Sequence, residues 1–351
     1  MLDTTRSASP RPLRARHPMP RATLASAAFA ACAALLPAPA SAQDFPNLKP
    51  LTLIVPFAAG SATDNSGRIL ADTLSETLGQ KVIVVNRPGA GAAVGLDSVA
   101  KSAPDGYTMG LASTSTYVFP AAIGDKRSYD TLKDLTVIAV PVELPQIIAS
   151  SARIPPRTLK ELIAYLKDHQ SAFVSAGPGT AAHVVGAVLV QTAGGKGDAV
   201  HYKSSSAGLP DLIEGRVFFT VDGVSSVAGS IKEGKLIGLA MIAPRRVPLL
   251  PEVPSMVEAW PEAPEFLKQM SAHLIVVPSK TPPEIVTKLN AAINRAVADA
   301  TMRDRLDKSG LFPRAPMSVD EVSVYVRGQV AEWTSTFTST GIRDAVRATA
   351  N

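Results

Sequence analysis

The sequence predicts an α/β protein of two lobes, each built on a mainly parallel sheet, with a ligand cleft between them. From Leu51 onward, short apolar runs alternate with helical patterns, which is typical of βαβ units and parallel sheets. Two proline-rich regions, residues 140–157 and 243–264, bracket a central unit of roughly one hundred residues, a usual size for a domain. Two connections between two lobes make a hinge and a cleft, where small molecules commonly bind. A single larger sheet is the alternative.

The elements follow from this alternation. Strands are expected at residues 51–55, 82–86, 108–112, 136–140, 146–150, 171–175, 198–202, 217–221, 236–241 and 273–277. Helices are expected at residues 63–78, 91–101, 158–168, 180–193, 206–214, 224–233, 283–299 and 318–339. Crossover helices would cover both faces of each sheet, which explains why several strands are continuously apolar. Because proline fixes the backbone and removes a donor, the proline-rich regions are interpreted as connectors. They divide the chain into a first lobe, residues 43–141 and 246–351, and a second lobe, residues 142–245.

The first 42 residues have the pattern of an export signal. Arginines precede an apolar stretch from Ala22 to Leu36, and Ala40-Ser41-Ala42 supplies the small residues of a cleavage site before Gln43. Met19 is a possible true start, because the residues before it add length but no apolar character. The apolar stretch is too short and too rich in alanine to favour a membrane-spanning helix. The pattern predicts a soluble protein exported to a bacterial periplasm.

Composition excludes several classes of function. The formal charge of +5 falls to +1 without the predicted signal, and no dense run of lysine or arginine remains, so nucleic acid is not an expected partner. The one cysteine, Cys32, lies in that signal, so the mature chain is expected to have neither a disulfide nor a thiol nucleophile. The four histidines after it are scattered without metal-ligand spacing. There is no G-x-S-x-G elbow, H-E-x-x-H motif or P-loop either, so no catalytic residue, metal or cofactor is expected.

The loop after the first strand is the most informative segment. The strand ends at Val55-Pro56, and the loop Phe57-Ala58-Ala59-Gly60-Ser61 leads into a helix that Thr63-Asp64 open. In an open α/β sheet, ligands bind at the carboxyl ends of the strands. Small side chains let a ligand approach backbone N–H groups at a helix N-terminus, which attract anions. The loop is therefore expected to hold a carboxylate or a phosphate, with an ordinary capped turn as the alternative.

A second loop of the same kind occurs in the central unit. Ser175-Ala176-Gly177-Pro178-Gly179-Thr180 follows a strand and precedes a helix that Thr180 can cap. A polar run, Ser113-Thr114-Ser115-Thr116, follows another strand. If the loops face each other across the cleft, these segments supply hydroxyl and N–H donors without a positive side chain, which suits carboxylate capture partly through water. For each hydroxyl the alternative is local turn chemistry.

Three polar residues have two interpretations each. His183 lies three residues after Thr180, where it either touches a ligand or makes a structural hydrogen bond. Asp222 ends the strand at 217–221, where its carboxylate either points into the cleft or caps the next helix. Asp64 either binds an amine or hydroxyl of a ligand or complements the dipole of its own helix.

The glycine-rich segment from Pro88 to Gly95 is similar to a dinucleotide fingerprint. The next strand, however, ends in Ala112-Ser113-Thr114, without an acidic residue to hold a ribose. Gly91 and Gly95 are instead expected to let a helix pack closely on the sheet.

A series of short motifs runs through the chain after the predicted signal. They are Val55-Pro56-Phe57…Gly60…Ala62-Thr63-Asp64, Val85-Asn86-Arg87-Pro88-Gly89-Ala90-Gly91, Pro104-Asp105-Gly106-Tyr107-Thr108, Gly177…Gly179-Thr180…His183, Gly215-Arg216-Val217, Gly234-Lys235-Leu236 and Leu250-Pro251-Glu252-Val253-Pro254. In this order the set resembles the Bug (TctC-like) family, the periplasmic solute-binding proteins of tripartite tricarboxylate transporters. No single motif is specific, but together they cover essentially the whole mature chain.

The resemblance implies a two-lobed periplasmic-binding-protein fold of type II character, monomeric, which binds a small organic acid between its lobes. It implies that the loops at Phe57–Asp64 and Gly177–Thr180 hold a ligand carboxylate, partly through water, and that residues around Thr114 and Asp222 line the rest. The expected ligand-binding residues are Phe57, Ala58, Gly60, Ser61, Thr63, Asp64, Thr114, Ser115, Gly177, Gly179, Thr180, His183 and Asp222. The expected partners are the membrane subunits of a tripartite tricarboxylate transporter or, for a sensor, a sensor kinase.

The sequence departs from the family pattern at three places. Ser61 replaces a glycine of the first loop, Lys203-Ser204 stands where lysine-glycine is usual, and Ser271-Ala272-His273 replaces an aromatic-rich segment. Two alternative functions are an exported α/β enzyme that acts on a small acid, with His183 or Asp222 as base, and a ligand sensor for a two-component receptor.

Overall fold

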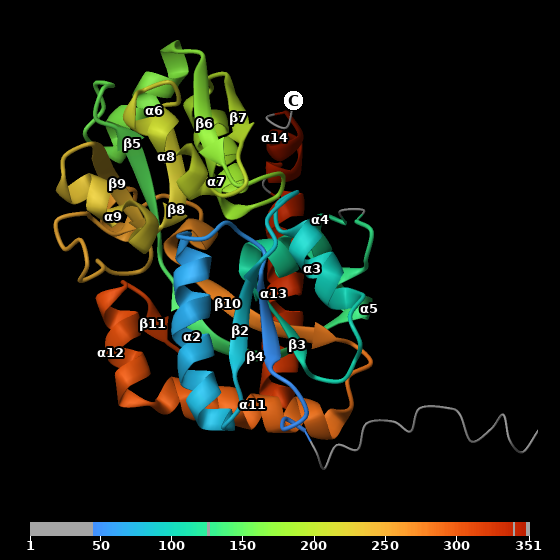
Figure 1. The fold of residues 1–351 in the computed structure, drawn as a ribbon. Coiled ribbons are helices and arrows are strands. Elements are labelled where there is room, and N and C mark those ends of the chain that lie inside the picture. The colour runs from blue at the N-terminus through green and yellow to red at the C-terminus, as the bar shows by residue number, and fades with distance from the viewer. Residues whose placement is uncertain (1–44, 125–126, 340, 349–351) are drawn as a thin grey trace, which may run out of the picture. The chain divides into compact units, whose positions relative to one another are not determined.

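The computed structural model describes residues 45–124, 127–339 and 341–348, so the predicted export signal lies outside the described residues. Two sheets organise this part of the chain (Figure 1). The first has six strands in the order β11-β4-β10-β3-β1-β2, and the second has five in the order β7-β6-β8-β5-β9. We call the parts built on them lobe 1 and lobe 2. The predicted two-lobed α/β fold class is confirmed, and the alternative of a single larger sheet is wrong.

The chain forms most of lobe 1, then all the strands of lobe 2, and then returns. The outward part of lobe 1 comprises β1 (Leu51–Val55), α2 (Ala62–Leu78), β2 (Val82–Asn86), α3 (Ala93–Ala100), β3 (Thr108–Ser113), the π-helical turn η1 (Thr114–Val118), α4 (Phe119–Ile123), α5 (Thr131–Asp134) and β4 (Leu135–Leu144). Lobe 2 comprises β5 (Gln146–Ser151), α6 (Leu159–Asp168), β6 (Ser171–Ser175), α7 (Ala181–Ala193), β7 (Gly197–His201), the 3₁₀ turn η2 (Ser205–Gly208), α8 (Leu209–Ile213), β8 (Phe219–Gly223), α9 (Val224–Lys232) and β9 (Leu236–Ile242). The rest comprises α10 (Met256–Ala259), the 3₁₀ turn η3 (Glu265–Lys268), β10 (Ser271–Pro278), α11 (Pro283–Ala298), α12 (Ala300–Lys308), β11 (Phe312–Pro313), α13 (Val319–Ser339) and α14 (Ile342–Ala348).

Each sheet contains a reversed strand between strands that run the other way. In lobe 1, β1, β2, β3 and β4 share one direction, whereas β10 and the two-residue β11 oppose them. In lobe 2, β6, β7, β8 and β9 share one direction, and β5 opposes them. Most strands of each sheet therefore run in the same direction, as predicted. The pairs of neighbouring strands are nevertheless partly parallel and partly antiparallel. The reason is topological, because the chain enters β5 and β10 from the other lobe rather than from a preceding strand of the same sheet.

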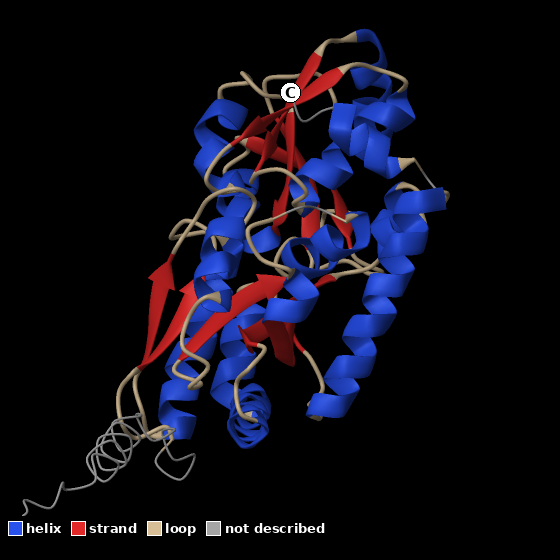
Figure 2. Ribbon diagram, turned by 90° about the vertical axis from the view of Figure 1, so that its right-hand side faces the viewer, coloured by secondary structure: helices blue, strands red, loops and turns tan. Residues whose placement is uncertain are grey.

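Helices cover both faces of each sheet, as Figure 2 shows by their position on either side of the strands. In lobe 1, α2 and α11 bury Leu70 and Leu289 on one face, and α3 and α13 bury Leu96 and Val322 on the other. In lobe 2, α6 and α7 cover one face, and α8 and α9 cover the other. The two-sided cover explains the continuously apolar strands of the sequence.

The C-terminal helices connect the two lobes. Helix α13 begins against the core of lobe 1 through Val322 and Val326 and ends with Phe337 in the core of lobe 2. Helix α14 then packs against α7, with Ile342 only 2% exposed. The predicted domain boundaries assign these residues to lobe 1 and do not describe this contact with lobe 2.

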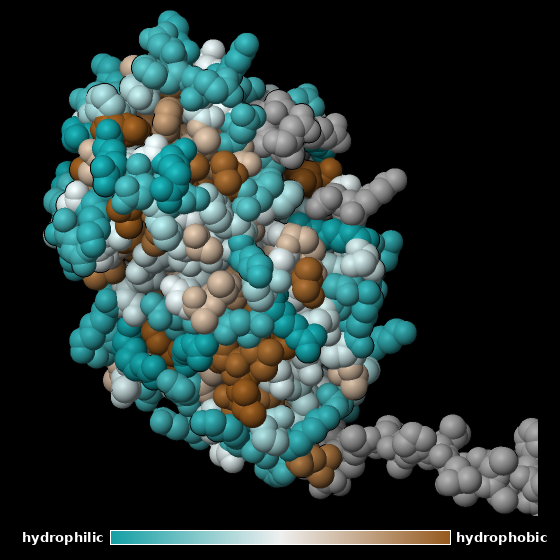
Figure 3. Space-filling model, turned by 45° about the horizontal axis from the view of Figure 1, so that its top comes forward, coloured by the Kyte–Doolittle hydropathy of each residue, from teal (hydrophilic) through white to brown (hydrophobic). Residues whose placement is uncertain are grey.

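The expected elements occur at nearly the expected residues. The segment 206–214 divides into η2 and α8, and β4 extends to Leu144. The sequence pattern missed β11 and the short helices α4, α5, α10, α12 and α14, most of which have too few residues to display an apolar period. No described helix is long and apolar enough to cross a membrane. On the face drawn in Figure 3, hydrophobic side chains form separate patches between hydrophilic areas.

Candidate functional site

A cavity lies where the carboxyl ends of the strands of both lobes meet. Lobe 1 contributes the loop after β1, the end of β3 and the end of β4. Lobe 2 contributes the loops after β6 and β7 and the end of β8. The reversed strands β5 and β10 contribute their first residues, Gln146 and Ser271, because their amino ends lie at the same edges. The lining residues are Phe57, Ser61, Ala62, Thr63, Ser113, Ser115, Leu144, Gln146, Ala176, Thr180, Ala181, Ala182, Ser204, Ser205, Val221, Asp222, Gly223 and Ser271.

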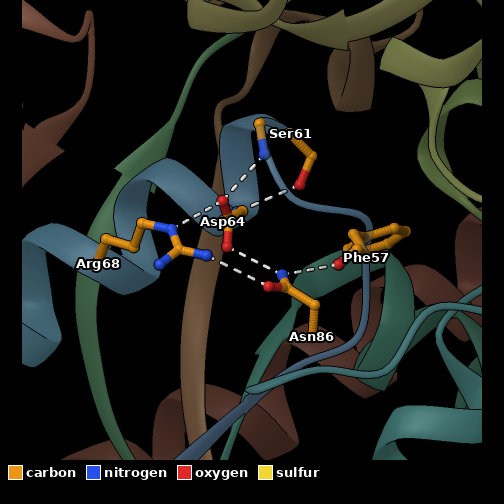
Figure 4. A network of polar contacts seen from close by, with 6 residues as sticks. Phe57, Ser61, Asp64, Arg68 and Asn86 are labelled. Atoms are coloured by element: carbon orange, nitrogen blue, oxygen red, sulfur yellow. Dashed lines mark hydrogen bonds and ion pairs between the residues drawn. The ribbon is translucent and has the colours of Figure 1, made fainter. Parts of the chain in front are cut away.

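The first loop is held by a polar network centred on Asp64 (Figure 4). One carboxylate oxygen of Asp64 accepts from the Gly60 N–H (2.9 Å) and from Arg68 Nε (3.0 Å), and the other accepts from Asn86 Nδ2 (2.8 Å). Asn86 also donates to the Phe57 carbonyl (3.0 Å), so it connects both ends of the loop. Burial raises the pKa of Asp64, but these hydrogen bonds outweigh it and hold the pKa below its ordinary value. Both carboxylate oxygens of Asp64 are occupied within the protein, so Asp64 shapes the loop rather than lining the cavity.

Ser61 caps the helix of the first loop. Its hydroxyl accepts from the Asp64 N–H (3.2 Å), which makes it the N-cap residue of α2. The backbone N–H of Ala62, the residue after Ser61, donates to Ser226 Oγ of lobe 2 (3.0 Å). The alternative of a capped turn is therefore realised for this loop, although Ser61 and Thr63 also line the cavity.

The second loop leaves its helix without a side-chain cap. Thr180 occupies the N-cap position of α7, but its hydroxyl donates to the Gly177 carbonyl (2.7 Å) instead of accepting from the helix. His183 Nδ1 accepts from the Gly179 N–H (3.1 Å), so it holds the loop and does not line the cavity. Ala181 and Ala182, in the first turn of α7, do line it. Small side chains at an uncapped helix N-terminus suit an anion.

Asp222 is the one ionisable side chain among the residues that line the cavity. Its Oδ1 accepts from the Gly223 N–H (2.7 Å), whereas its buried Oδ2 has no hydrogen-bond partner. Burial raises the pKa of this carboxyl to about 7, and its hydrogen bond from the Gly223 N–H only partly opposes the effect. Asp222 therefore borders the cavity with a buried carboxyl whose protonation sets the charge of the cavity wall.

The residues of the polar run after β3 have two roles: some make structural hydrogen bonds and others line the cavity. The Thr114 hydroxyl accepts from the Ala272 N–H (3.1 Å), so Thr114 connects η1 to β10 and does not line this cavity. The hydroxyls of Ser113 and Ser115 lie 3.1 Å apart, and both residues line it. Ala272 is buried in the core of lobe 1, and Ser271, the residue before it, reaches the cavity instead.

The lobes touch at places that only glycine permits. A Cβ atom on Gly91 of lobe 1 would lie 2.5 Å from the Pro178 carbonyl oxygen, and one on Gly177 would lie 2.5 Å from the Gly91 nitrogen. Likewise, a Cβ atom on Gly223 would lie 2.3 Å from the Ala62 Cβ. Gly95 fits closely against Pro56 within lobe 1, which agrees with the expected packing role of this glycine. The glycine-rich segment therefore serves close packing, and Gly91 extends that packing to the other lobe.

The structure brings together six of the thirteen expected site residues. Those that line the cavity are Phe57, Ser61, Thr63, Ser115, Thr180 and Asp222. Those that do not are Ala58, Gly60, Asp64, Thr114, Gly177, Gly179 and His183, although Thr114 lines a second cavity that shares part of its wall with this one. The polar lining residues outside the expected set are Ser113, Gln146, Ser204, Ser205 and Ser271, of which Ser113 belongs to the polar run noted after the strand at 108–112. Ser113 ends β3, and Ser204 and Ser205 follow β7, so the strand ends were the available signal for these three. Gln146 and Ser271 are instead the first residues of the reversed strands.

The donor set is neutral. None of the described lining residues is lysine, arginine or histidine. Among the described residues of the chain, no group of histidine, cysteine, aspartate and glutamate side chains could hold a metal ion. The arrangement can bind an anion through hydroxyl, amide and backbone donors, and Asp222 is its one acidic group among the described lining residues.

Comparisons with known proteins agree with the two-lobed fold. The model of the tripartite tricarboxylate transporter family receptor matches residues 67–342. The chain is 31% identical to protein BugT of Bordetella pertussis over 312 residues, which cover 87% of this chain and 93% of BugT. The solved periplasmic binding protein BugD is 29% identical, with a TM-score of 0.77, over 84% of this chain and 98% of BugD. MatC from Rhodopseudomonas palustris, solved with bound malate, is 27% identical, with a TM-score of 0.76, over 86% of this chain and 99% of MatC. These similarities extend over both lobes.

Proposed function

Because this chain belongs to the tripartite tricarboxylate transporter receptor family, the Bug or TctC family of solute-binding proteins, we propose that it captures a small organic acid between its lobes in the periplasm. The captured acid would be delivered to the membrane subunits of a tripartite transporter. The malate bound to the related MatC supports a carboxylate as the group that is recognised.

One observation carries the proposal for this chain. The uncapped first turn of α7, with Ala181 and Ala182, meets the hydroxyls of Ser61, Thr63 and Ser115 across the cavity. Hydrogen-bond donors that converge from two lobes hold a carboxylate only when the lobes are closed. A ligand that binds the closed state better than the open one shifts the protein towards closure.

The alternative of an exported enzyme has one supporting observation. Asp222 borders the cavity and burial raises the pKa of its carboxyl to about 7, which would suit a general base. The second candidate base, His183, accepts a hydrogen bond from Gly179 and lies outside the lining. Recovery of a bound acid chemically unchanged after long incubation would contradict the enzyme hypothesis. Its conversion would contradict the binding hypothesis.

A thermal-stability screen of ligand-stripped protein against mono-, di- and tricarboxylates tests the proposed function. A binding acid at one hundred times its Kd should add about 2.7 kcal/mol to the free energy of unfolding. Thr180→Phe fills the cavity and should abolish this gain, whereas Gln191→Phe, at an exposed position of the same helix, should keep it. If no organic acid stabilises the protein, the carboxylate proposal is wrong.

A further inference from the structure

We propose that the preferred ligand is a monocarboxylic acid whose uncharged apolar tail lies in a second compartment of the same cleft, beside α13. This inference rests on the proposed function, because the carboxylate of the acid occupies the cavity already described. It adds the chemical class of the rest of the ligand.

The second compartment continues the first. Both are lined by Ser115, Gln146, Ala181 and Ser271, which therefore form the boundary between them. Beyond this boundary the wall becomes apolar and aromatic, with Phe119, Val185, Ile242, Phe266, Met270 and Trp333. An acid whose carboxylate lies near Ser115 and Ala181 thus has its tail directed towards this wall.

The aromatic part of the wall joins elements of both lobes. The ring of Trp333, on α13, lies 4.2 Å from that of Phe119 and 5.2 Å from that of Phe266, measured between centroids. Phe119 and Phe266 are almost fully buried, whereas Trp333 is half-buried and faces the compartment. Each methylene group that moves from water against such a surface strengthens binding by roughly fourfold.

Charge excludes a second carboxylate from this end of the ligand. Among the described residues that line the two compartments there is no lysine, arginine or histidine, and the one ionisable side chain is the acid Asp222. Lys268, next to the compartment in sequence, pairs with Glu265 at 3.5 Å. The first carboxylate has the N–H groups of the uncapped first turn of α7 and several hydroxyls as donors, whereas a second one in this compartment would be desolvated beside mainly apolar side chains and without a cation, which is unfavourable.

The outer end of the compartment is polar but uncharged. Gln269 and Gln329 line it, and Gln329 Nε2 donates to Glu332 (3.1 Å), an exposed acid that further disfavours an anion here. Two amides can bond a neutral oxygen or nitrogen at the end of a tail. The site thus selects an acid with one charge, in contrast to the malate, with two, that is bound to MatC.

Binding of matched acids to the wild-type protein tests the class of ligand. Titration calorimetry with acetate, butanoate, hexanoate, benzoate and phenylacetate should give affinities that rise with the apolar area of the tail. Succinate and adipate should bind at least about tenfold more weakly than the monocarboxylates of the same length. Long-tailed acids should also change the fluorescence of Trp333, and this change should disappear in Trp333→Phe but persist in Trp260→Phe.

Two variants locate the tail. Val185→Phe fills the second compartment and should weaken hexanoate binding but spare acetate, whereas Gln191→Phe should spare both. Gln329→Lys, at a half-buried position that tolerates a long side chain, should raise the affinity for adipate relative to hexanoate, and the neutral Gln329→Met should not. The lysine variant keeps the test valid if Val185→Phe fails to fold.

The outcomes separate this inference from the proposed function. Tighter binding of succinate, malate or citrate than of any monocarboxylate, unchanged by Val185→Phe and Gln329→Lys, overturns the monocarboxylate inference and leaves carboxylate capture intact. Failure of every acid to bind overturns both.

Discussion

At the scale of residues, Asp222 is the side chain whose charge decides how an acid binds. Its carboxyl borders the cavity, has one unpartnered oxygen, and has a pKa that burial raises from 3.8 to about 7. Below this pH the neutral carboxyl places no negative charge beside a bound carboxylate. Above it the two anions repel each other.

We therefore expect the affinity for a carboxylate to fall as the pH rises from 6 to 8, and Asp222→Asn to remove most of this dependence. Titration calorimetry of both proteins across this range measures the effect. The amide keeps the acceptor for the Gly223 N–H, so the variant isolates the charge. An equally steep fall in Asp222→Asn would assign the dependence to another group.

The same residue predicts a pH effect on the stability of the ligand-free protein. Because the pKa is higher in the folded state than in the unfolded state, the contribution of the protonated carboxyl is complete below about pH 4 and is lost as the pH rises towards 7. The difference in melting temperature between Asp222→Asn and wild type should thus grow in favour of the variant from pH 5 to pH 8. The opposite trend would contradict the buried position of this carboxyl.

At the scale of elements, two loops meet across the cleft through Gly91 and Gly177. Both glycines have positive φ, and a Cβ atom on either would collide with the backbone of the other lobe. The glycine-rich segment that resembles a dinucleotide fingerprint thus forms part of the contact between the lobes.

Gly91→Ala should weaken ligand binding by roughly tenfold or more, because it opposes the closed state that the ligand selects. Gly79→Ala is the matched control, since Gly79 also has positive φ but meets nothing within 4 Å of an added Cβ. Calorimetry gives the affinities, and small-angle scattering with saturating ligand gives the degree of closure. Equal effects of both substitutions would show that backbone strain alone is responsible.

At the scale of the whole molecule, the C-terminal helices α13 and α14 pack against lobe 2. Ile342 of α14 is 2% exposed and belongs to the lobe 2 core, although it lies far beyond the last strand of that lobe in sequence. Trp333, farther back on α13, packs against the cores of both lobes. The stability of lobe 2 therefore depends on residues that the linear order places with lobe 1.

Ile342→Ala should lower the free energy of unfolding by about 2–5 kcal/mol, the usual effect of truncating a buried isoleucine. Val324→Ala, at a 62% exposed position of α13, should change it by less than about 0.5 kcal/mol. Denaturant unfolding measures both. A negligible effect of Ile342→Ala would indicate that α14 is not packed on α7 in solution.

Much of this protein could be predicted from its sequence, because periodicity and turn residues act locally. The alternation of β-branched runs with helical patterns determined the two-lobed α/β class, and the motifs from Val55 to Pro254 determined the family. The placement of candidate ligand loops at strand ends also followed from the sequence. The expected and observed positions agree for the six residues that line the cavity, which are Phe57, Ser61, Thr63, Ser115, Thr180 and Asp222.

Only the tertiary structure decided which side chains of those loops face the cavity. Asp64 and His183 have the right chemistry and the right loops, yet each is occupied by a backbone N–H of its own loop. Gln146 and Ser271 were not among the expected ligand-binding residues, and they reach the cavity because β5 and β10 run against their neighbours. The apolar compartment joins Phe119, Val185 and Trp333 from distant parts of the chain. Such contacts depend on how whole elements pack against one another, and local sequence patterns do not encode that packing.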